Sequence, residues 1–68
     1  MTRLLRFEAG DRSEYFYSPA NNEIGRLYTF DGVYIVRCEG WEAQSPSYHK
    51  ARAELATELR RRRWTLPE

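Results

Sequence analysis

The stretch that decides the fold of this chain is IGRLYTFDGVYIVRCE, residues 24–39. Asp31-Gly32 stands between two alternating apolar segments and favours a type I′ turn, because both central residues of that turn need positive φ. The sequence therefore predicts a hairpin of two strands, Ile24–Phe30 and Val33–Glu39. A two-residue turn also fixes the register, and it predicts three cross-strand pairs: Phe30 with Val33, Tyr28 with Ile35, and Leu27 with Val36.

Both faces of this hairpin are largely apolar. The face without charge is expected to form the core, and it carries Leu27, Thr29, Tyr34, Val36 and Cys38. The second face carries Ile24 and Glu39 and the six residues that we expect to bind a partner: Arg26, Tyr28, Phe30, Val33, Ile35 and Arg37. The alternative is that the N-terminal segment or the tail Trp64–Leu66 covers this second face as another core layer.

The remaining segments predict an α+β fold in a single domain of residues 1–68. Strands are expected over Arg3–Glu8 and Glu14–Ser18, joined by the turn residues Gly10–Ser13, and Gly40 is expected to end the sheet. Trp41 is expected to cover an edge of the core. The prediction is a small antiparallel sheet of three to four strands, in the order β-β-β-β-α, with one C-terminal helix packed on one face.

The helix is expected over residues 46–62. Either Ser45, followed by a proline suited to the first helical position, or Ser47 can act as its N-cap. The apolar stripe is narrow and consists of Tyr48, Ala51, Leu55 and Leu59, with Ala56 at its margin. Trp64 and Leu66 are expected to fold back onto the end of the helix.

Composition limits the class of protein. With 41% hydrophobic and 31% charged residues the chain is expected to fold rather than to remain disordered. The single cysteine, Cys38, excludes an internal disulfide, and no apolar run reaches the length of a membrane span. A cytoplasmic protein that does not contact a membrane is therefore expected.

Arg60-Arg61-Arg62-Arg63 is the most conspicuous local feature of the sequence. Together with Lys50, these arginines are the residues that could bind phosphate groups of a nucleic acid. Cations in the last turn of a helix also complement the helix dipole, and this is the alternative reading. Since successive helical residues point about 100° apart, four in a row cannot all face one groove.

No catalytic or metal-binding motif is present, so we expect no enzyme activity, cofactor, metal or small-molecule substrate. Cys38 and His49 could form a thiol–imidazole pair if the strand end lies near the helix start, but Cys38 belongs to the predicted core face. One His and one Cys cannot supply the four ligands of a structural zinc site. Glu54 and Glu58 lie one turn apart, with Lys50 and Arg61 or Arg62 within reach, which is typical of a solvated face with ion pairs.

Two families are similar to this chain in part. A sheet followed by a helix resembles the small DNA-binding modules at the start of phage-type integrases, which place the sheet in the major groove. The stretch Ser47–Ala53, SYHKARA, resembles the last helix of double-stranded-RNA-binding domains. That family also has a helix before its sheet and a lysine-rich helix start, and this chain has neither. Membership of either family is not inferred.

The expected function is therefore that of a small non-enzymatic protein-binding module encoded by a bacterium or a phage. It would inhibit or regulate a larger assembly through its sheet face, or form a homodimer. The excess of aromatic residues, 15%, favours this function because aromatic side chains are enriched where proteins meet. The alternative is a nucleic-acid-binding regulator that uses the arginine-rich helix end and the basic and aromatic sheet face.

Overall fold

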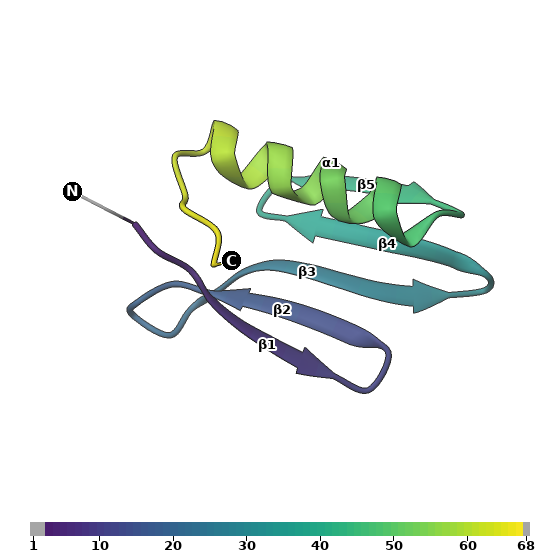
Figure 1. The fold of residues 1–68 in the computed structure, drawn as a ribbon, viewed down its shortest axis with the longest axis horizontal. Helices are drawn as coiled ribbons and strands as arrows, with labels where there is room; N and C mark the ends of the chain where they lie inside the picture. The colour runs from purple at the N-terminus through teal and green to yellow at the C-terminus, as the bar shows by residue number, and fades with distance from the viewer. Residues whose placement is uncertain (1–2, 68) are drawn as a thin grey trace.

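The structure, a computed structural model, describes residues 3–67 and has an α+β fold. A five-stranded antiparallel sheet is followed by one helix, and the strands lie side by side in sequence order (Figure 1). The elements are β1 Arg6–Gly10, β2 Ser13–Tyr17, β3 Glu23–Phe30, β4 Val33–Cys38, β5 Trp41–Ser45 and α1 Tyr48–Arg61. The predicted fold class is confirmed, with five strands where three to four were expected.

The central hairpin of β3 and β4 forms as predicted. Phe30 is opposite Val33, Tyr28 is opposite Ile35, and Leu27 is opposite Val36. The turn residues Asp31 and Gly32 have φ values of 52° and 81°, so both adopt the left-handed conformation that a type I′ turn requires. Local turn chemistry is thus sufficient to set this register.

The prediction that Gly40 ends the sheet is wrong. Gly40 has a φ of 73° and occupies a tight turn that leads directly into β5. Cys38 pairs with Trp41 across this turn, and β5 runs antiparallel to β4 as far as Ser45. The Trp41 side chain packs against the edge of the core, as expected.

The core lies between the sheet and α1. Leu27, Val36 and Cys38 from the predicted core face are buried, whereas Thr29 on the same face is exposed. From the helix, Ala51, Leu55, Ala56 and Leu59 are buried, so the predicted stripe faces the sheet. Ser47 is the N-cap, and its side chain accepts a hydrogen bond from the backbone N–H of Lys50.

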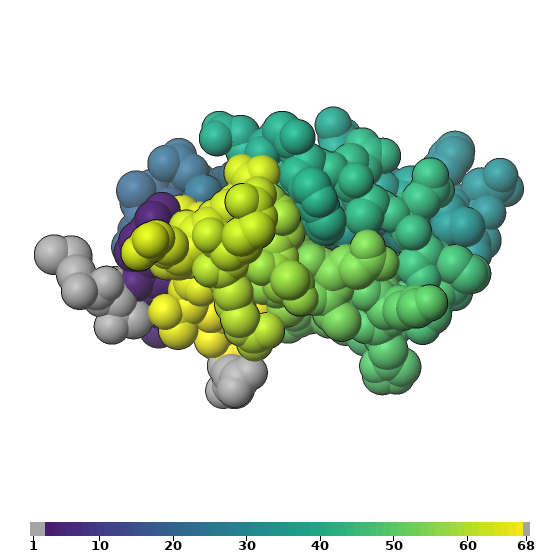
Figure 2. Space-filling view, turned by 90° about the horizontal axis from the view of Figure 1, so that it is seen from above, coloured from purple at the N-terminus to yellow at the C-terminus, as the bar shows by residue number. Residues whose placement is uncertain are grey.

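The backbone of α1 packs on β3, β4 and β5, and the helix reaches β2 through the side chains of Tyr48 and Arg52. The close approach to β3 is made possible by Gly25, where an added Cβ would lie 3.4 Å from side-chain carbons of Leu55 and Leu59. Figure 2 views the molecule from the helix side and shows α1 running along it, with the yellow tail at one end next to the purple N-terminal segment. No helix within residues 3–67 is long and apolar enough to cross a membrane.

The tail after α1 returns to the sheet. The N–H of Trp64 donates to the carbonyl of Leu59 and the N–H of Arg63 donates to that of Arg60, which is the Schellman pattern of helix termination. Thr65 then forms a parallel bridge with Leu4, and Leu66 is buried in the core. The chain before β1 is thereby held by the tail, so the first strand begins at Arg6 instead of Arg3.

Candidate functional site

The sheet face opposite α1, here called the open face, is formed by the side chains that alternate away from the core. Cross-strand pairing assigns to it Arg6, Glu8, Ser13, Tyr15, Tyr17, Glu23, Arg26, Tyr28, Phe30, Val33, Ile35, Arg37, Glu42 and Gln44. The alternative that the chain covers this face itself is not observed within the described residues. The N-terminal segment becomes β1 in the plane of the sheet, and Trp64 and Leu66 join the core on the helix side.

All six residues predicted to bind a partner lie on the open face. Four of them form a continuous group near the β3–β4 turn, here called the apolar patch, which consists of Tyr28, Phe30, Val33 and Ile35. Phe30 is 67% exposed, and the other three are half-buried by their neighbours in the sheet. Ile24, which was assigned to this face, instead packs against the core, because the register of β2 and β3 shifts at Tyr17.

Two further aromatic residues of the open face were not identified from the sequence. Tyr15 and Tyr17 lie on β2, and their ring centroids are 6.3 Å apart. The run Tyr15-Phe16-Tyr17 requires that its members divide between two faces, but only the pairing of β2 with β3 shows which ring is buried. Phe16 is fully buried, so the two tyrosines extend the aromatic surface of the open face beyond the apolar patch.

The arginines of the open face are paired with acids on the same face. Arg26 donates hydrogen bonds of 3.0 and 3.1 Å to the two carboxylate oxygens of Glu23, and this contact raises the pKa of Arg26. The Nε of Arg37 lies 3.4 Å from a carboxylate oxygen of Glu42. Arg6 forms an ion pair with Glu8 and also donates to the side chain of Asn21. The cations of this face are therefore largely balanced by acids.

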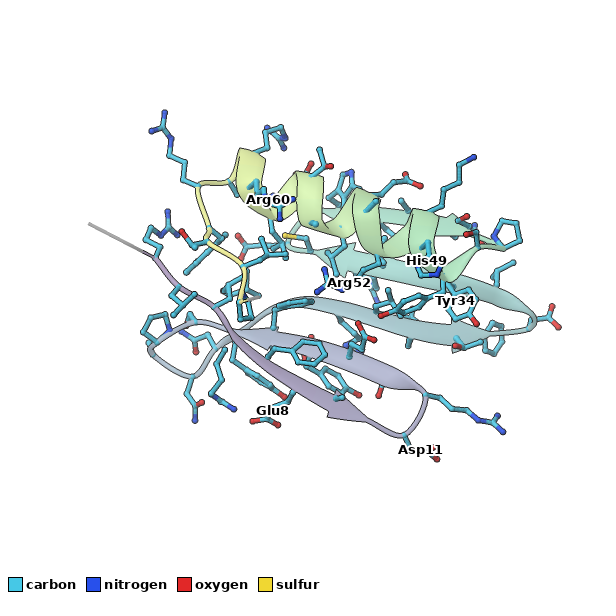
Figure 3. The ribbon with its side chains drawn as sticks, in the orientation of Figure 1. Glu8, Asp11, Tyr34, His49, Arg52 and Arg60 are labelled. Carbon is cyan, nitrogen blue, oxygen red and sulfur yellow. The ribbon has the colours of Figure 1, made fainter. Side chains whose placement is uncertain are left out.

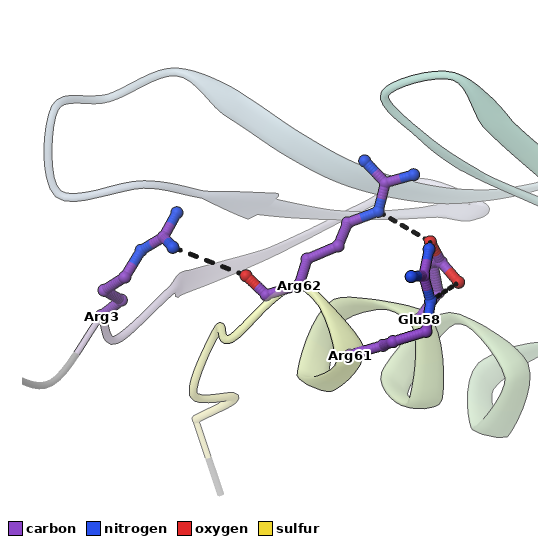
Figure 4. A network of polar contacts seen from close by, with 4 residues as sticks. All are labelled: Arg3, Glu58, Arg61 and Arg62. Carbon is purple, nitrogen blue, oxygen red and sulfur yellow. Dashed lines mark hydrogen bonds and ion pairs between the residues drawn. The ribbon is translucent and has the colours of Figure 1, made fainter.

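At the helix end, two of the four consecutive arginines bind an acid of the same helix. Arg61 donates to Glu58 at 3.1 and 2.5 Å, and Arg62 donates to Glu58 at 2.7 Å (Figure 4). These two guanidinium groups lower the pKa of Glu58 to about 2. The expected ion pairs of Glu58 therefore form. The Glu58 side chain is only 8% exposed, however, so this acid does not belong to a solvated face as expected.

The residues predicted to bind phosphate do not form one patch. Lys50 lies in the first turn of α1, whereas Arg60 lies in its last turn, and a helix of 14 residues is about 20 Å long. Arg63 lies beyond the helix with a φ of 70°. The five cations thus divide between the two ends of the helix.

A polar cluster joins β2 to the helix on the covered side of the sheet. The hydroxyl of Tyr48 donates a 2.6 Å hydrogen bond to Glu14, and this carboxylate raises the pKa of Tyr48. The Nε of Arg52 lies 3.4 Å from the other oxygen of Glu14, and its guanidinium lies 4.8 Å from the centroid of the Phe16 ring. Figure 3 shows Arg52 and Tyr34 beside the first half of α1 and Arg60 near its end. These contacts fasten the β1–β2 hairpin to the helix.

The residues considered for thiol chemistry lie near opposite ends of the helix. Cys38 is buried next to Gly25, beneath the second half of α1, and burial raises the pKa of its thiol. His49 is exposed at the start of α1, where its ring contacts Tyr48. Helix α1 runs parallel to β4, with Tyr34 at the strand start beside Tyr48 at the helix start, so the end of β4 lies near the helix end and not near its start as expected.

The described residues contain no group of three or more His, Cys, Asp or Glu that could hold a metal ion. Comparison of the chain with protein-family models, with curated proteins and with solved structures found no match.

Proposed function

We propose that this chain is a non-enzymatic protein-binding module that engages its partner through the open face. The module would inhibit or regulate a larger assembly, either by binding it through this face or by acting as a homodimer. The observation that carries the proposal is the apolar patch, which lies uncovered beside charges that already have partners. Exposed apolar groups that are contiguous in space are characteristic of interaction sites.

The chemistry of the patch suits a protein partner. Tyr28 and Phe30 present rings, and Val33 and Ile35 present branched aliphatic groups, so the patch can be desolvated without leaving a charge unpaired. The ion pairs Arg26–Glu23 and Arg37–Glu42 lie next to it and would form a polar rim. An apolar centre with a polar rim is the usual anatomy of a protein interface.

A nucleic-acid partner is less favoured, because phosphate binding depends on cations that are free to replace counterions. On the open face Arg26 and Arg37 are engaged with acids, and at the helix end Arg61 and Arg62 are engaged with Glu58. Each of these contacts would have to be broken or shared before phosphate could bind. The balance of charge therefore supports a protein as the partner.

The test is photo-crosslinking in the native cell from two adjacent positions of β3. Phe30 and Thr29 are both exposed, but Phe30 lies on the open face and Thr29 lies on the covered side. A benzophenone amino acid at Phe30 is expected to give a crosslinked protein band that resists nuclease, whereas the same group at Thr29 is expected to give none. A band that disappears with nuclease would support the nucleic-acid alternative. Equal labelling from the two positions, or no adduct from Phe30, would refute the proposal.

A further inference from the structure

We infer that the partner of the open face is a second copy of this chain, packed face to face so that the two sheets form a sandwich. This inference rests on the proposed function, because it names the partner of the same surface. The open face is apolar near the β3–β4 turn, and an apolar sheet surface is stabilised by a layer that covers it. Helix α1 supplies one layer, and the sheet of the second copy would supply the other.

The pairing of β3 with β4 divides the open face into rows that cross the strands. Three rows follow one another from the turn towards the other end of the hairpin: Phe30–Val33, Tyr28–Ile35 and Arg26–Arg37. The apolar patch provides the first two rows, and the arginines provide the third. The middle row is therefore apolar and has an apolar row on one side and a cationic row on the other.

This order of rows is complementary to itself. A two-fold axis that crosses the strands at the middle row brings Tyr28 and Ile35 against the same residues of the second copy. The same rotation places the first row of each copy opposite the third row of the other. The exposed ring of Phe30 then faces the guanidinium of Arg26 of the second copy, which is a favourable cation–π arrangement. Self-complementarity of one patch is what a two-fold interface requires.

The charge of the face permits two copies to approach. Two surfaces with a strong charge of one sign would repel each other. Here each arginine has an acidic neighbour on the same sheet face, in the pairs Arg6–Glu8, Arg26–Glu23 and Arg37–Glu42. The close contacts would therefore be made by apolar and aromatic groups and by the stacked arginines, whose ion pairs with Glu23 and Glu42 remain intact.

The size of the sheet limits the affinity that we expect for the dimer. Five strands about 4.8 Å apart, with about six residues each at about 3.4 Å per residue, form a flat face of about 500 Å². Standard protein interfaces bury about 800 Å² on each partner. The dimer is therefore expected to be reversible and to form in the upper micromolar range.

The test is sedimentation equilibrium of the purified chain between about 5 µM and about 1 mM, a range chosen for a small interface. The weight-average mass of the wild type is expected to rise with concentration from the monomer value towards twice that value. Ile35→Glu places two like charges at the two-fold axis and is expected to keep the chain monomeric throughout. Thr29→Glu, an exposed position on the covered side, adds the same charge and is expected to dimerise like the wild type. Circular dichroism confirms that both variants fold.

Disulfide trapping gives a second measurement that does not depend on a change of charge. Ile35→Cys is expected to crosslink to its own copy on oxidation, whereas Thr29→Cys is not, and the buried Cys38 contributes little background. A wild type that stays monomeric to about 1 mM would overturn the dimer at the size that the sheet allows. If Phe30 still crosslinked to a different protein in the cell, the proposed function would stand without the dimer. A monomer with no adduct from Phe30 would refute both.

Discussion

Two residues near the end of α1, Glu58 and Arg63, have unusual environments. Arg63 adopts a φ of 70° as the residue that closes the Schellman motif, a position at which glycine is the usual choice. A side chain in this conformation is strained by contact of its Cβ with the backbone. The arginine run therefore does not adopt one uniform conformation, and its last member is held at a cost to stability.

Arg63→Gly is expected to raise the free energy of unfolding by about 0.5–1 kcal/mol, because glycine adopts positive φ without strain. Urea unfolding followed by tryptophan fluorescence measures the change. Arg60→Gly is the matched control: it removes the same side chain inside the last helical turn and is expected to lower stability by about 0.5–1 kcal/mol. If both variants changed stability in the same direction, the strain at position 63 would not be the cause.

Glu58 is expected to make stability depend on pH in a specific range. Arg61 and Arg62 lower its pKa from 4.5 to about 2 in the folded protein. The stabilising effect is therefore complete above the unfolded pKa of 4.5 and is lost as the pH falls towards 2. The melting temperature of Glu58→Gln should lie below that of the wild type at neutral pH, and the difference should shrink in acid. A difference that stayed constant down to about pH 2 would contradict this linkage.

At the level of elements, the approach of α1 to the sheet depends on a missing side chain. Gly25 lies in β3 directly beneath Leu55 and Leu59, which allows the helix to pack close to the strand. Tight contact at this position leaves space for one carbon atom but not for a branched side chain. A small residue at position 25 thus permits the observed approach of the helix to the sheet.

Gly25→Ala is expected to change the free energy of unfolding by less than about 0.5 kcal/mol, because the added carbon makes ordinary contact and also reduces the freedom of the unfolded chain. Gly25→Val is expected to destabilise the protein by about 1–3 kcal/mol, because its methyl groups would displace the helix. Chemical denaturation of the two variants measures the difference. Equal stability of the alanine and valine variants would show that the interface has unfilled space at this point.

At the level of the whole molecule, the elements predicted correctly are those that depend on neighbouring residues. Asp31-Gly32 specifies its own turn, and the absence of charge on one side of the hairpin identifies the core face. The same reasoning predicted correctly that Arg26, Tyr28, Phe30, Val33, Ile35 and Arg37 share one sheet face, because all six belong to one hairpin. That they bind a partner remains a prediction.

The errors arise where distant parts of the chain meet. The parallel bridge between Leu4 and Thr65 holds residues that were assigned to the first strand, and no local pattern indicates it. Strand β5 was missed because Glu42 and Gln44 point outward, which makes its five residues look like a polar loop after Gly40. The faces of Tyr15 and Tyr17 depend on pairing with β3 and could not be read from β2 alone.

The bridge that joins Leu4 to Thr65 has a consequence for engineering. It brings the beginning and the end of the described chain to one corner of the molecule, so a short peptide could connect them and produce a closed ring. Reopening that ring at the exposed residues Asp31-Gly32 would give a circular permutant with the same neighbours in space but a different order of synthesis. In that permutant, β4, β5 and α1 would emerge from the ribosome before the other three strands.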